Sequence, residues 1–322
     1  MTIQIHWQLD VTAEAGRSEP SARPRVPGVA RDVRTPALNR YDYYAQVARA
    51  AALTGFDGLF IPYREDGDDS QIVAAALART TPRLRLVPEF PASAGSAVYA
   101  AKQAATFQRF THQRLGWAIA PDGDDAARAR RGDQVAAKDL AERLDEFLTV
   151  ARAVHRGPSF TFKGRFFEVQ NGGFAEPLNR VAFPTVYLRG TEEERLKLSA
   201  RHADVHLLDA APADELKNVI EVLGWLALQQ GRSVAAGLIQ PVLARETAEE
   251  AEAARRDAGI ADDAPVITGS YDDVAARLAD LASLGIRHFV LTATPGFEEA
   301  YRIGQFVLPR LRALTGSARA AA

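Results

Sequence analysis

The chain has 322 residues, of which 47% are hydrophobic and 25% are charged. This length suits one (β/α) barrel, for which about 250 residues plus insertions is typical, and the apolar content is enough for a large buried core. The formal net charge of −2 excludes a general attraction to nucleic acid or anionic lipid. The absence of cysteine excludes disulfides, thiolate metal sites and a catalytic thiol. With no apolar run long enough to span a membrane and no signal peptide, we expect a cytoplasmic enzyme or binding protein.

The first half of the chain alternates short apolar runs with helical patterns. Residues Ile3 to Leu9 alternate apolar and polar side chains and predict the first strand. The segment from Asp10 to Asn39 is rich in Pro, Arg and Gly, and predicts a long loop of the kind that is usually functional or mobile. After it we expect helix 41–53, strand 59–62, helix 71–79, strand 84–87, helix 98–110 and strand 115–120.

The second half continues this alternation with one interruption. Asp122 to Gln134 is charged and predicts a loop over one end of the sheet. Residues 159–183 predict an antiparallel excursion, with a hairpin that turns at Lys163-Gly164. The remaining expected elements are helix 140–155, strand 185–188, helix 192–203, strand 205–208, helix 213–230, strand 238–243 and helix 247–258.

The stretch from Val266 to Arg310 predicts a loop, a helix, a strand and a second helix. Ser270 and Asp273 have the spacing of a capping box at the start of the first helix, and Gly285 suits its end. The apolar run 288–294 is too short for a helix and predicts a strand covered on both sides, as in a parallel sheet.

The repeated strand and helix order predicts the fold class. Right-handed crossovers between eight parallel strands build an α/β (β/α)8 TIM barrel, here with insertions. We expect a single domain over residues 1–315 and a disordered tail over residues 316–322.

Two loops are candidate anion sites because ligands of such barrels lie at the carboxyl ends of the strands. The first is Thr268-Gly269-Ser270, where backbone N–H groups and the positive helix end attract an anion, although a plain helix cap explains the same residues. The second is Arg189-Gly190-Thr191, in which Thr191 forms a possible capping box with Glu194. Arg189 suits either a bidentate anion contact or an ordinary ion pair with the acidic run 192–194.

Three further residues are candidates at strand ends. Glu89 follows an expected strand, and enclosure would raise its pKa and make it a base, whereas solvation or a salt bridge to Arg85 would leave it without a role. Trp7 and Phe60 could contact a flat ring system, although buried aromatics are mostly core residues. The six histidines do not cluster, so we predict no metal site.

Several segments resemble one enzyme family in order and spacing. They are Gly55-Phe56-Asp57-Gly58, residues 101–106 (AKQAAT), residues 162–167 (FKGRFF), residues 184–188 (PTVYL), residues 200–204 (ARHAD), Phe289-Val290-Leu291 and residues 298–304 (EEAYRIG). They are similar to the bacterial luciferase-like flavin-dependent monooxygenases, and most closely to the reduced-FMN-dependent alkanesulfonate monooxygenases. The resemblance implies that the two candidate loops hold the FMN phosphate and that Trp7 and Phe60 pack near the flavin.

The sequence departs from that family where its members do their chemistry. Positions that carry a cysteine, an asparagine, an arginine, a histidine and a tyrosine in the sulfonate enzymes fall at Gly67, Ala118, Ile239, Pro241 and Thr294. The long mobile lid of the relatives, after the seventh strand, is shortened to the residues between Ala258 and Val266. Specificity for sulfonates is therefore not expected.

The resemblance implies an FMN-dependent monooxygenase that takes reduced FMN from a partner flavin reductase and uses O2 on a small organic substrate. Glu89 and Arg189 are the candidate catalytic residues, and a dimer is expected. Two alternatives stay open. One is a deazaflavin-dependent dehydrogenase. The other is a non-catalytic barrel subunit that pairs with an active paralogue.

Overall fold

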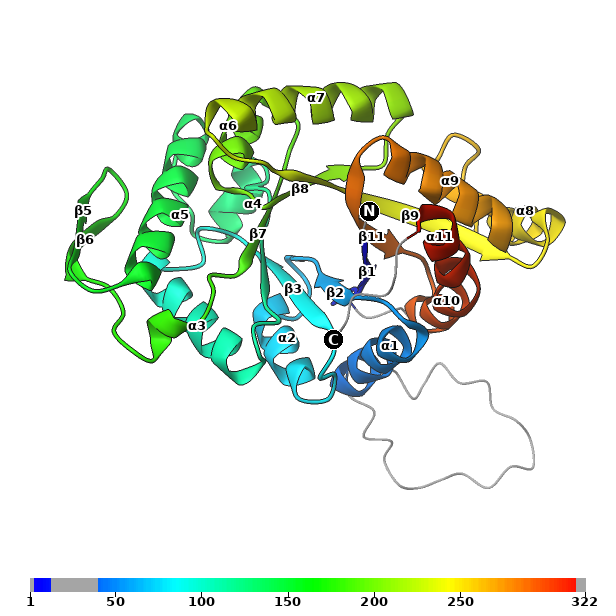
Figure 1. Cartoon of the computed structure of the whole chain (residues 1–322), viewed down its shortest axis with the longest axis horizontal. Helices are drawn as coiled ribbons and strands as arrows, with labels where there is room; N and C mark the ends of the chain where they lie inside the picture. The colour runs from blue at the N-terminus through cyan, green and yellow to red at the C-terminus, as the bar shows by residue number, and fades with distance from the viewer. Residues whose placement is uncertain (1–2, 13–39, 317–322) are drawn as a thin grey trace.

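The computed structural model describes residues 3–12 and 40–316, and its centre is a closed ring of eight parallel strands surrounded by helices (Figure 1). The ring strands are β1 (Gln4–Gln8), β2 (Gly58–Ile61), β3 (Arg85–Phe90), β4 (Gly116–Ile119), β7 (Thr185–Arg189), β8 (Val205–Asp209), β9 (Ala235–Arg245) and β11 (Ile286–Thr292). Pairing of β1 with β11 and of β8 with β9 closes the ring. The predicted TIM barrel is confirmed.

The helices lie close to their predicted positions. They are α1 (Arg40–Thr54), α2 (Ser70–Ala78), α3 (Ala97–Phe110), α4 (Asp125–Arg130), α5 (Leu140–Arg156), α6 (Glu193–His202), α7 (Ala213–Gln229), α8 (Ala248–Asp257), α9 (Tyr271–Ser283), α10 (Gly296–Arg302) and α11 (Leu308–Thr315), with a π-helical turn, Ile303–Val307, between the last two. The short helix α4 was not expected within the charged loop. It begins because the side chain of Asp124 accepts a hydrogen bond from Ala127 N at 2.7 Å.

The predicted hairpin is confirmed as β5 (Phe160–Lys163) and β6 (Glu168–Gly172), which pair antiparallel. A buried carboxylate on α5 holds its turn. Glu146 accepts hydrogen bonds from the backbone N–H groups of Arg165, Phe166 and Phe167 at 2.7, 2.8 and 3.0 Å. The loop predicted over 10–39 lies almost entirely outside the described residues, as does the predicted tail apart from Gly316.

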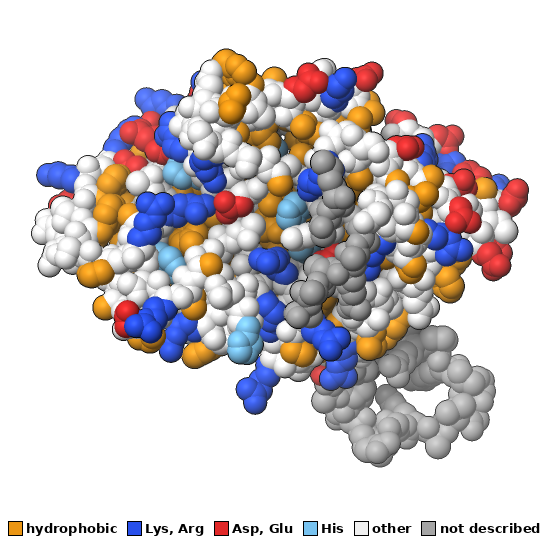
Figure 2. Space-filling view, in the orientation of Figure 1, with side chains coloured by type: hydrophobic (Ala, Val, Ile, Leu, Met, Phe, Trp, Pro, Cys, Tyr) orange, Lys and Arg blue, Asp and Glu red, His pale blue; other side chains and the backbone are white. Residues whose placement is uncertain are grey.

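A further strand lies outside the ring and corrects the sequence analysis. Residues expected as a loop before α9 form β10 (Ile267–Ser270), which pairs in parallel with the distal end of β9, from Val242 to Arg245. The seventh barrel strand is correspondingly longer than predicted. Figure 1 shows β9 running out of the barrel toward α8, at the edge where Figure 2 shows many acidic side chains. We call the pair of Val242–Arg245 with Ile267–Ser270 the ledge.

The interior of the barrel is filled by side chains from alternate positions of the strands. Phe60, Val87, Tyr187, Leu207 and Val290 are among the buried residues that form this inner cluster. Two larger clusters pack between the strands and the helices. Glycine is needed inside the ring where a side chain would collide, because a Cβ at Gly58 would lie 2.5 Å from His6 Nδ1.

Within the described residues, no helix combines the length and the apolar composition that crossing a bilayer requires.

Candidate active site at the carboxyl-terminal mouth of the barrel

The strand register places three side chains, those of Gln8, Glu89 and Arg189, at the carboxyl-terminal mouth of the barrel. The inner cluster contains Val87, Tyr187 and Ile239, and side chains two residues apart on a strand share a face. Glu89 and Arg189 therefore point inward one layer closer to the carboxyl ends than Val87 and Tyr187. Gln8, two residues beyond the buried His6, lies in the same position on β1.

Glu89 is enclosed in this mouth with an exposed fraction of only 3%. Its Oε2 accepts a hydrogen bond from Tyr63 N at 3.0 Å, and its Oε1 accepts one from Arg189 Nη1 at 3.4 Å. Burial raises the pKa of the Glu89 carboxyl above its usual value, and the Arg189 charge opposes that rise. A carboxyl of this kind can hold a proton at higher pH than a solvated one, as a general acid or base requires.

Arg189 on β7 contacts carboxylates on two other strands, β3 and β8. Besides Glu89 on β3, its Nη2 donates to both carboxylate oxygens of Asp209 on β8, at 2.8 and 3.1 Å. Of the two expected roles, the ion pair with Glu192–Glu194 is absent from the contacts of Arg189 in the described chain, and Glu89 and Asp209 take its place. The guanidinium keeps further donors for an anionic group at the mouth.

The loop after β7 differs from its prediction in one respect. The capping box expected between Thr191 and Glu194 is wrong, because α6 begins at Glu193 and its N-cap Glu192 makes no side-chain cap bond. Gly190 has φ of 118°, which favours glycine, and a Cβ there would lie 2.8 Å from Glu192 Oε2. The uncapped backbone N–H groups of this helix start therefore remain available to a ligand.

A basic cluster that was not predicted from the sequence lies beside this loop. It consists of Arg131, Arg143 and Arg195, which gather around Asp122. Arg143 Nη2 lies 3.0 Å from Asp122 Oδ1, Arg195 contacts the other carboxylate oxygen, and Arg131 donates to the Asp122 carbonyl. Arg143 also pairs with Asp133 at 2.7 Å. The arginine-rich run 128–131 was the available signal, but it was interpreted only as a charged loop.

The other candidate loop lies away from the mouth. Thr268, Gly269 and Ser270 are on β10, where Gly269 pairs with Ala244. Ala244 lies five residues beyond Ile239 on β9, and Ile239 is the register partner of Asp209 at the mouth. At about 3.3 Å per residue this is roughly 16 Å further along the strand. The loop and the Arg189-Gly190-Thr191 loop do not converge on one site through any contact of the described residues.

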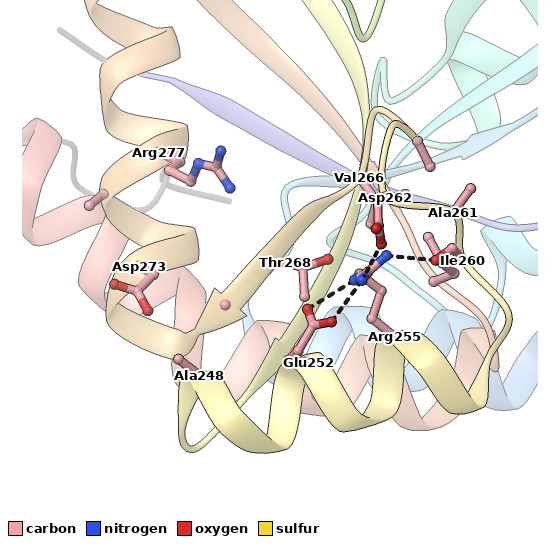
Figure 3. Close-up of a pocket in the computed structure, with 13 residues that line it drawn as sticks. Ala248, Glu252, Arg255, Ile260, Ala261, Asp262, Val266, Thr268, Asp273 and Arg277 are labelled. Atoms are coloured by element: carbon pink, nitrogen blue, oxygen red, sulfur yellow. Dashed lines mark hydrogen bonds and ion pairs between the residues drawn. The ribbon is translucent and has the colours of Figure 1, made fainter.

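The helix start beside β10 is also closed by acidic groups. The predicted capping box is confirmed, with Asp273 N donating to Ser270 Oγ at 3.2 Å and Ser270 N donating to Asp273 Oδ2 at 3.0 Å. Thr268 and Gly269 instead line a surface groove of about 810 Å³ between α8, the 258–266 loop and α9. Figure 3 shows Arg255 in this groove directed at Glu252 and Asp262.

The two aromatic candidates have different surroundings. Trp7 is fully buried on the outer face of β1, where its Nε1 donates to Gly296 O at 3.1 Å and its ring packs 5.3 Å from that of Phe56. It therefore faces the helices, and the mouth lies on the other side of its strand. Phe60 belongs to the inner cluster, one layer below Glu89 and Arg189, and forms part of the apolar floor of the mouth.

No group of three or more His, Cys, Asp or Glu side chains with the geometry of a metal site occurs in residues 3–12 and 40–316.

A closed parallel barrel with its charged and titratable residues at the carboxyl ends of the strands defines an enzyme-like TIM barrel. The family model described as luciferase-like monooxygenase matches residues 18–262. The chain belongs to the luciferase-like monooxygenase family.

Solved structures show the same fold at low sequence identity. A riboflavin lyase solved with modified FMN and riboflavin matches with a TM-score of 0.81 and 18% identity, over 99% of this chain and 93% of its own. The EDTA monooxygenase of Chelativorans sp. BNC1 matches with a TM-score of 0.71 and 17% identity, over 87% and 92%. The coenzyme F420-dependent tetrahydromethanopterin reductase of Methanopyrus kandleri matches with a TM-score of 0.75 and 14% identity, over 97% and 100%. The fold thus occurs with both flavin and deazaflavin cofactors.

Proposed function

We propose that the protein is a flavin-dependent monooxygenase that uses reduced FMN, supplied by a separate flavin reductase, and O2 on a small organic substrate. The observation that carries this proposal is the buried Glu89, hydrogen-bonded to Arg189, at the mouth of a luciferase-like barrel. The basic cluster around Asp122 lies beside the same strand ends and suits the phosphate of FMN. We also expect a cytoplasmic protein that forms dimers.

Of the two loops expected to hold the phosphate, the one after β7 fits better. Gly190 and Thr191 precede a helix start without a side-chain cap, and Arg195 is close to Gly190. At β10, the carboxylate of Asp273 already satisfies the backbone N–H of Ser270 and would repel a phosphate. We assign the phosphate to Gly190, Thr191 and Arg195, and no longer to Thr268, Gly269 and Ser270.

Bound reduced FMN would supply the two electrons that activate O2. The residues of this chain then have three tasks. Glu89 exchanges a proton with the reacting groups, because burial raises its pKa above the usual value. Arg189 stabilises negative charge that develops at the mouth, and Phe60 excludes water from below.

Flavin binding tests the assignment of the phosphate. We expect Arg195→Gln to weaken FMN binding by roughly ten- to a hundred-fold, since a hydrogen bond to a charged group contributes about 1.5–3 kcal/mol. Ser270→Ala is the matched control and should leave the affinity unchanged. Titration of protein fluorescence with oxidised and reduced FMN measures both. A loss of affinity in Ser270→Ala with none in Arg195→Gln would reverse the assignment.

Turnover tests the role of Glu89. With a flavin reductase, NADH, FMN and a panel of small organic substrates, we expect substrate-dependent oxygenation that Glu89→Gln reduces by about a hundred-fold or more. The pH dependence of the rate should lose the limb that Glu89 contributes. A variant with an unchanged pH profile would remove Glu89 from the mechanism.

A deazaflavin-dependent dehydrogenase is the second enzymatic candidate, favoured by the fold shared with an F420-dependent reductase at a TM-score of 0.75. Parallel titrations with FMN and a deazaflavin cofactor separate the two. Tight binding of the deazaflavin and none of FMN would replace the first proposal.

A non-catalytic subunit is the candidate from another class. It is favoured by the pairing of Arg189 with both Glu89 and Asp209, which satisfies the mouth charges without a ligand. It predicts a stable complex with a catalytic paralogue and no turnover by this chain alone. Substrate oxidation by the isolated chain would exclude it.

A further inference from the structure

Arg85 lies at the opposite end of the barrel from the proposed active site, at the amino-terminal start of β3. Its guanidinium is partly buried, and its only hydrogen bond to a described residue goes from Nη1 to Thr185 Oγ1 at a long 3.3 Å. The other buried or half-buried arginines contact carboxylates or backbone carbonyls within the described chain. Arg114, for example, donates to the carbonyls of Ala78, Thr81 and Leu84. The Arg85 guanidinium thus makes no ion pair within the described residues.

Three aromatic rings with unpaired polar atoms lie next to Arg85 inside the barrel. His6 and His288 are parallel with centroids 6.1 Å apart, and Tyr187 meets both edge-on at 6.2 and 5.7 Å. His6 and Tyr187 are each only 1% exposed. Both ring nitrogens of His6, the hydroxyl of Tyr187 and Nδ1 of His288 are buried without a hydrogen-bond partner. Buried polar atoms in folded proteins almost always have partners, so four of them in one cluster require an explanation.

Arg85 is the charged member of this cluster, and the carboxylate of Asp204, which acts on Tyr187 from outside it, is already paired with Arg152 and Arg232. Burial and the nearby Arg85 charge lower the pKa of His288 to about 4, and burial, His288 and Arg85 lower the pKa of His6 well below its usual value. Burial raises the pKa of Tyr187 to about 12. At neutral pH the cluster therefore contains one guanidinium cation, two neutral imidazoles and a phenol, each of which can direct an N–H or O–H at a ligand.

The cluster is reachable from the amino-terminal end of the barrel. Arg85, Thr185 and His288 are each partly exposed, whereas His6 and Tyr187 form the buried wall behind them. This end of a TIM barrel normally serves stability and carries no ligand.

We propose that Arg85, Thr185, Tyr187, His6 and His288 form a binding site for one small inorganic anion. The anion compensates the charge of Arg85 and accepts hydrogen bonds from the Tyr187 hydroxyl and from one N–H of each neutral imidazole. The site is separate from the flavin site, because the flavin lies at the carboxyl ends of the same strands. It stabilises the folded barrel and takes no part in electron transfer.

Thermal unfolding of the full chain tests this site. Phosphate, sulfate, nitrate and chloride are added at constant ionic strength, which a bulky organic buffer anion maintains. We expect the unfolding temperature to rise by a few degrees at anion concentrations well above Kd. All variants carry Arg195→Gln, which weakens the proposed phosphate site at the opposite end of the barrel. In this background the rise should disappear in Arg85→Gln and persist in Arg83→Gln, which removes an exposed charge two residues away. It should also persist in Arg189→Gln, which alters only the opposite end of the barrel.

Nuclear magnetic resonance of the histidine rings keeps the test valid if Arg85→Gln does not fold. In the wild type, the ¹⁵N signals of His6 and His288 should shift with saturable dependence on the added anion. The pH midpoint of His288 should rise, because a bound anion favours the protonated ring. The signals are assigned with His288→Gln and His6→Gln. Ring signals that stay constant up to about 100 mM anion would show that only water reaches the cluster, and the proposal would be overturned.

Discussion

Glu89 places an acidic group in an enclosed site, so its effect on stability depends on pH. The folded pKa is raised above the ordinary value of 4.5. The contribution of Glu89 to stability is therefore complete below about pH 4.5 and is lost as the pH rises through the folded pKa. We expect Glu89→Gln to gain stability relative to the wild type between pH 4.5 and pH 8, as measured by unfolding temperatures across that range.

The control for this prediction is Glu249→Gln, which changes an exposed carboxylate in the first turn of α8. Its difference from the wild type should vary little over the same pH range. An unfolding-temperature difference for Glu89→Gln that does not depend on pH would show that the carboxyl titrates at its ordinary pKa.

Arg114 is a second residue whose hydrogen bonds predict a large contribution to the free energy of unfolding. Its guanidinium donates to the carbonyl oxygens of Thr111, Ala78, Thr81 and Leu84, at 2.6 to 2.8 Å. Because Arg114→Met removes all four of these hydrogen bonds, we expect a loss of about 3 kcal/mol in the free energy of unfolding. Urea unfolding measures it, with Arg109→Met on the exposed face of α3 as the control. A loss of less than about 1 kcal/mol would mean that water replaces the guanidinium.

At the scale of single residues, sequence predicted the site in part. The position of Glu89 and Arg189 at the mouth was predicted because a strand end fixes which end of the barrel a residue occupies, and their catalytic roles stay predictions. Trp7 faces the helices because the alternation along β1 puts its side chain on the same face as Ile5 and Leu9, a signal that was present in the sequence. Arg195 was missed because it meets Asp122 only through the fold, across a sequence separation of 73 residues.

The β5–β6 hairpin depends on α5 through one side chain. Glu146 accepts three backbone N–H groups from the turn. Glu146→Ala removes all three acceptor contacts, and we expect hydrogen exchange at Arg165, Phe166 and Phe167 to accelerate by roughly a hundred-fold, which corresponds to about 2.7 kcal/mol of local stability.

The control is Glu142→Ala, which removes only the exposed contact to Arg165 at 3.0 Å. Hydrogen exchange followed by mass spectrometry or by resonance can compare both variants. Equal exchange at these three amides in the wild type and in Glu146→Ala would show that the strand pairing alone holds the turn.

At the scale of helices and strands, prediction from the sequence was correct where the local residue pattern alone determines the structure. The Ser270 and Asp273 capping box formed as predicted because both partners lie within one helical turn. The box predicted for Thr191 did not form, because α6 begins two residues later at Glu193. The strand β10 was not predicted because its partner is the extension of β9, which the local pattern around Gly269 does not reveal.

The two ends of the chain are linked through one buried ion pair, which bears on the stability of the whole molecule. Arg312 Nη2 on α11 donates to Gly55 O at 2.7 Å and lies 3.4 Å from Asp57 Oδ2. Asp57 also accepts a hydrogen bond from Ile5 N on β1 at 2.8 Å. Arg312→Met leaves the Asp57 charge buried without its partner, so we expect a loss of about 3 kcal/mol.

Because the pair joins segments from the whole sequence, we expect the loss to appear in a single unfolding transition. Arg310→Met removes an exposed ion pair with Asp272 and should cost less than about 1 kcal/mol. Urea unfolding followed by circular dichroism and by tryptophan fluorescence measures both. Two separate transitions in Arg312→Met would show that α11 unfolds independently of the barrel.

The ledge lies outside the ring of barrel strands, so the connection that precedes it can change in length. Both ends of the connection 258–266 are held by α8 and β10, outside the hydrogen-bonded ring. Doubling the length of such a flexible connection costs only about 0.6 kcal/mol in closure entropy. Extra segments inserted after Asp263 should therefore leave the barrel intact. Insertions of very different length can evolve at this connection without a change in the strands of the barrel.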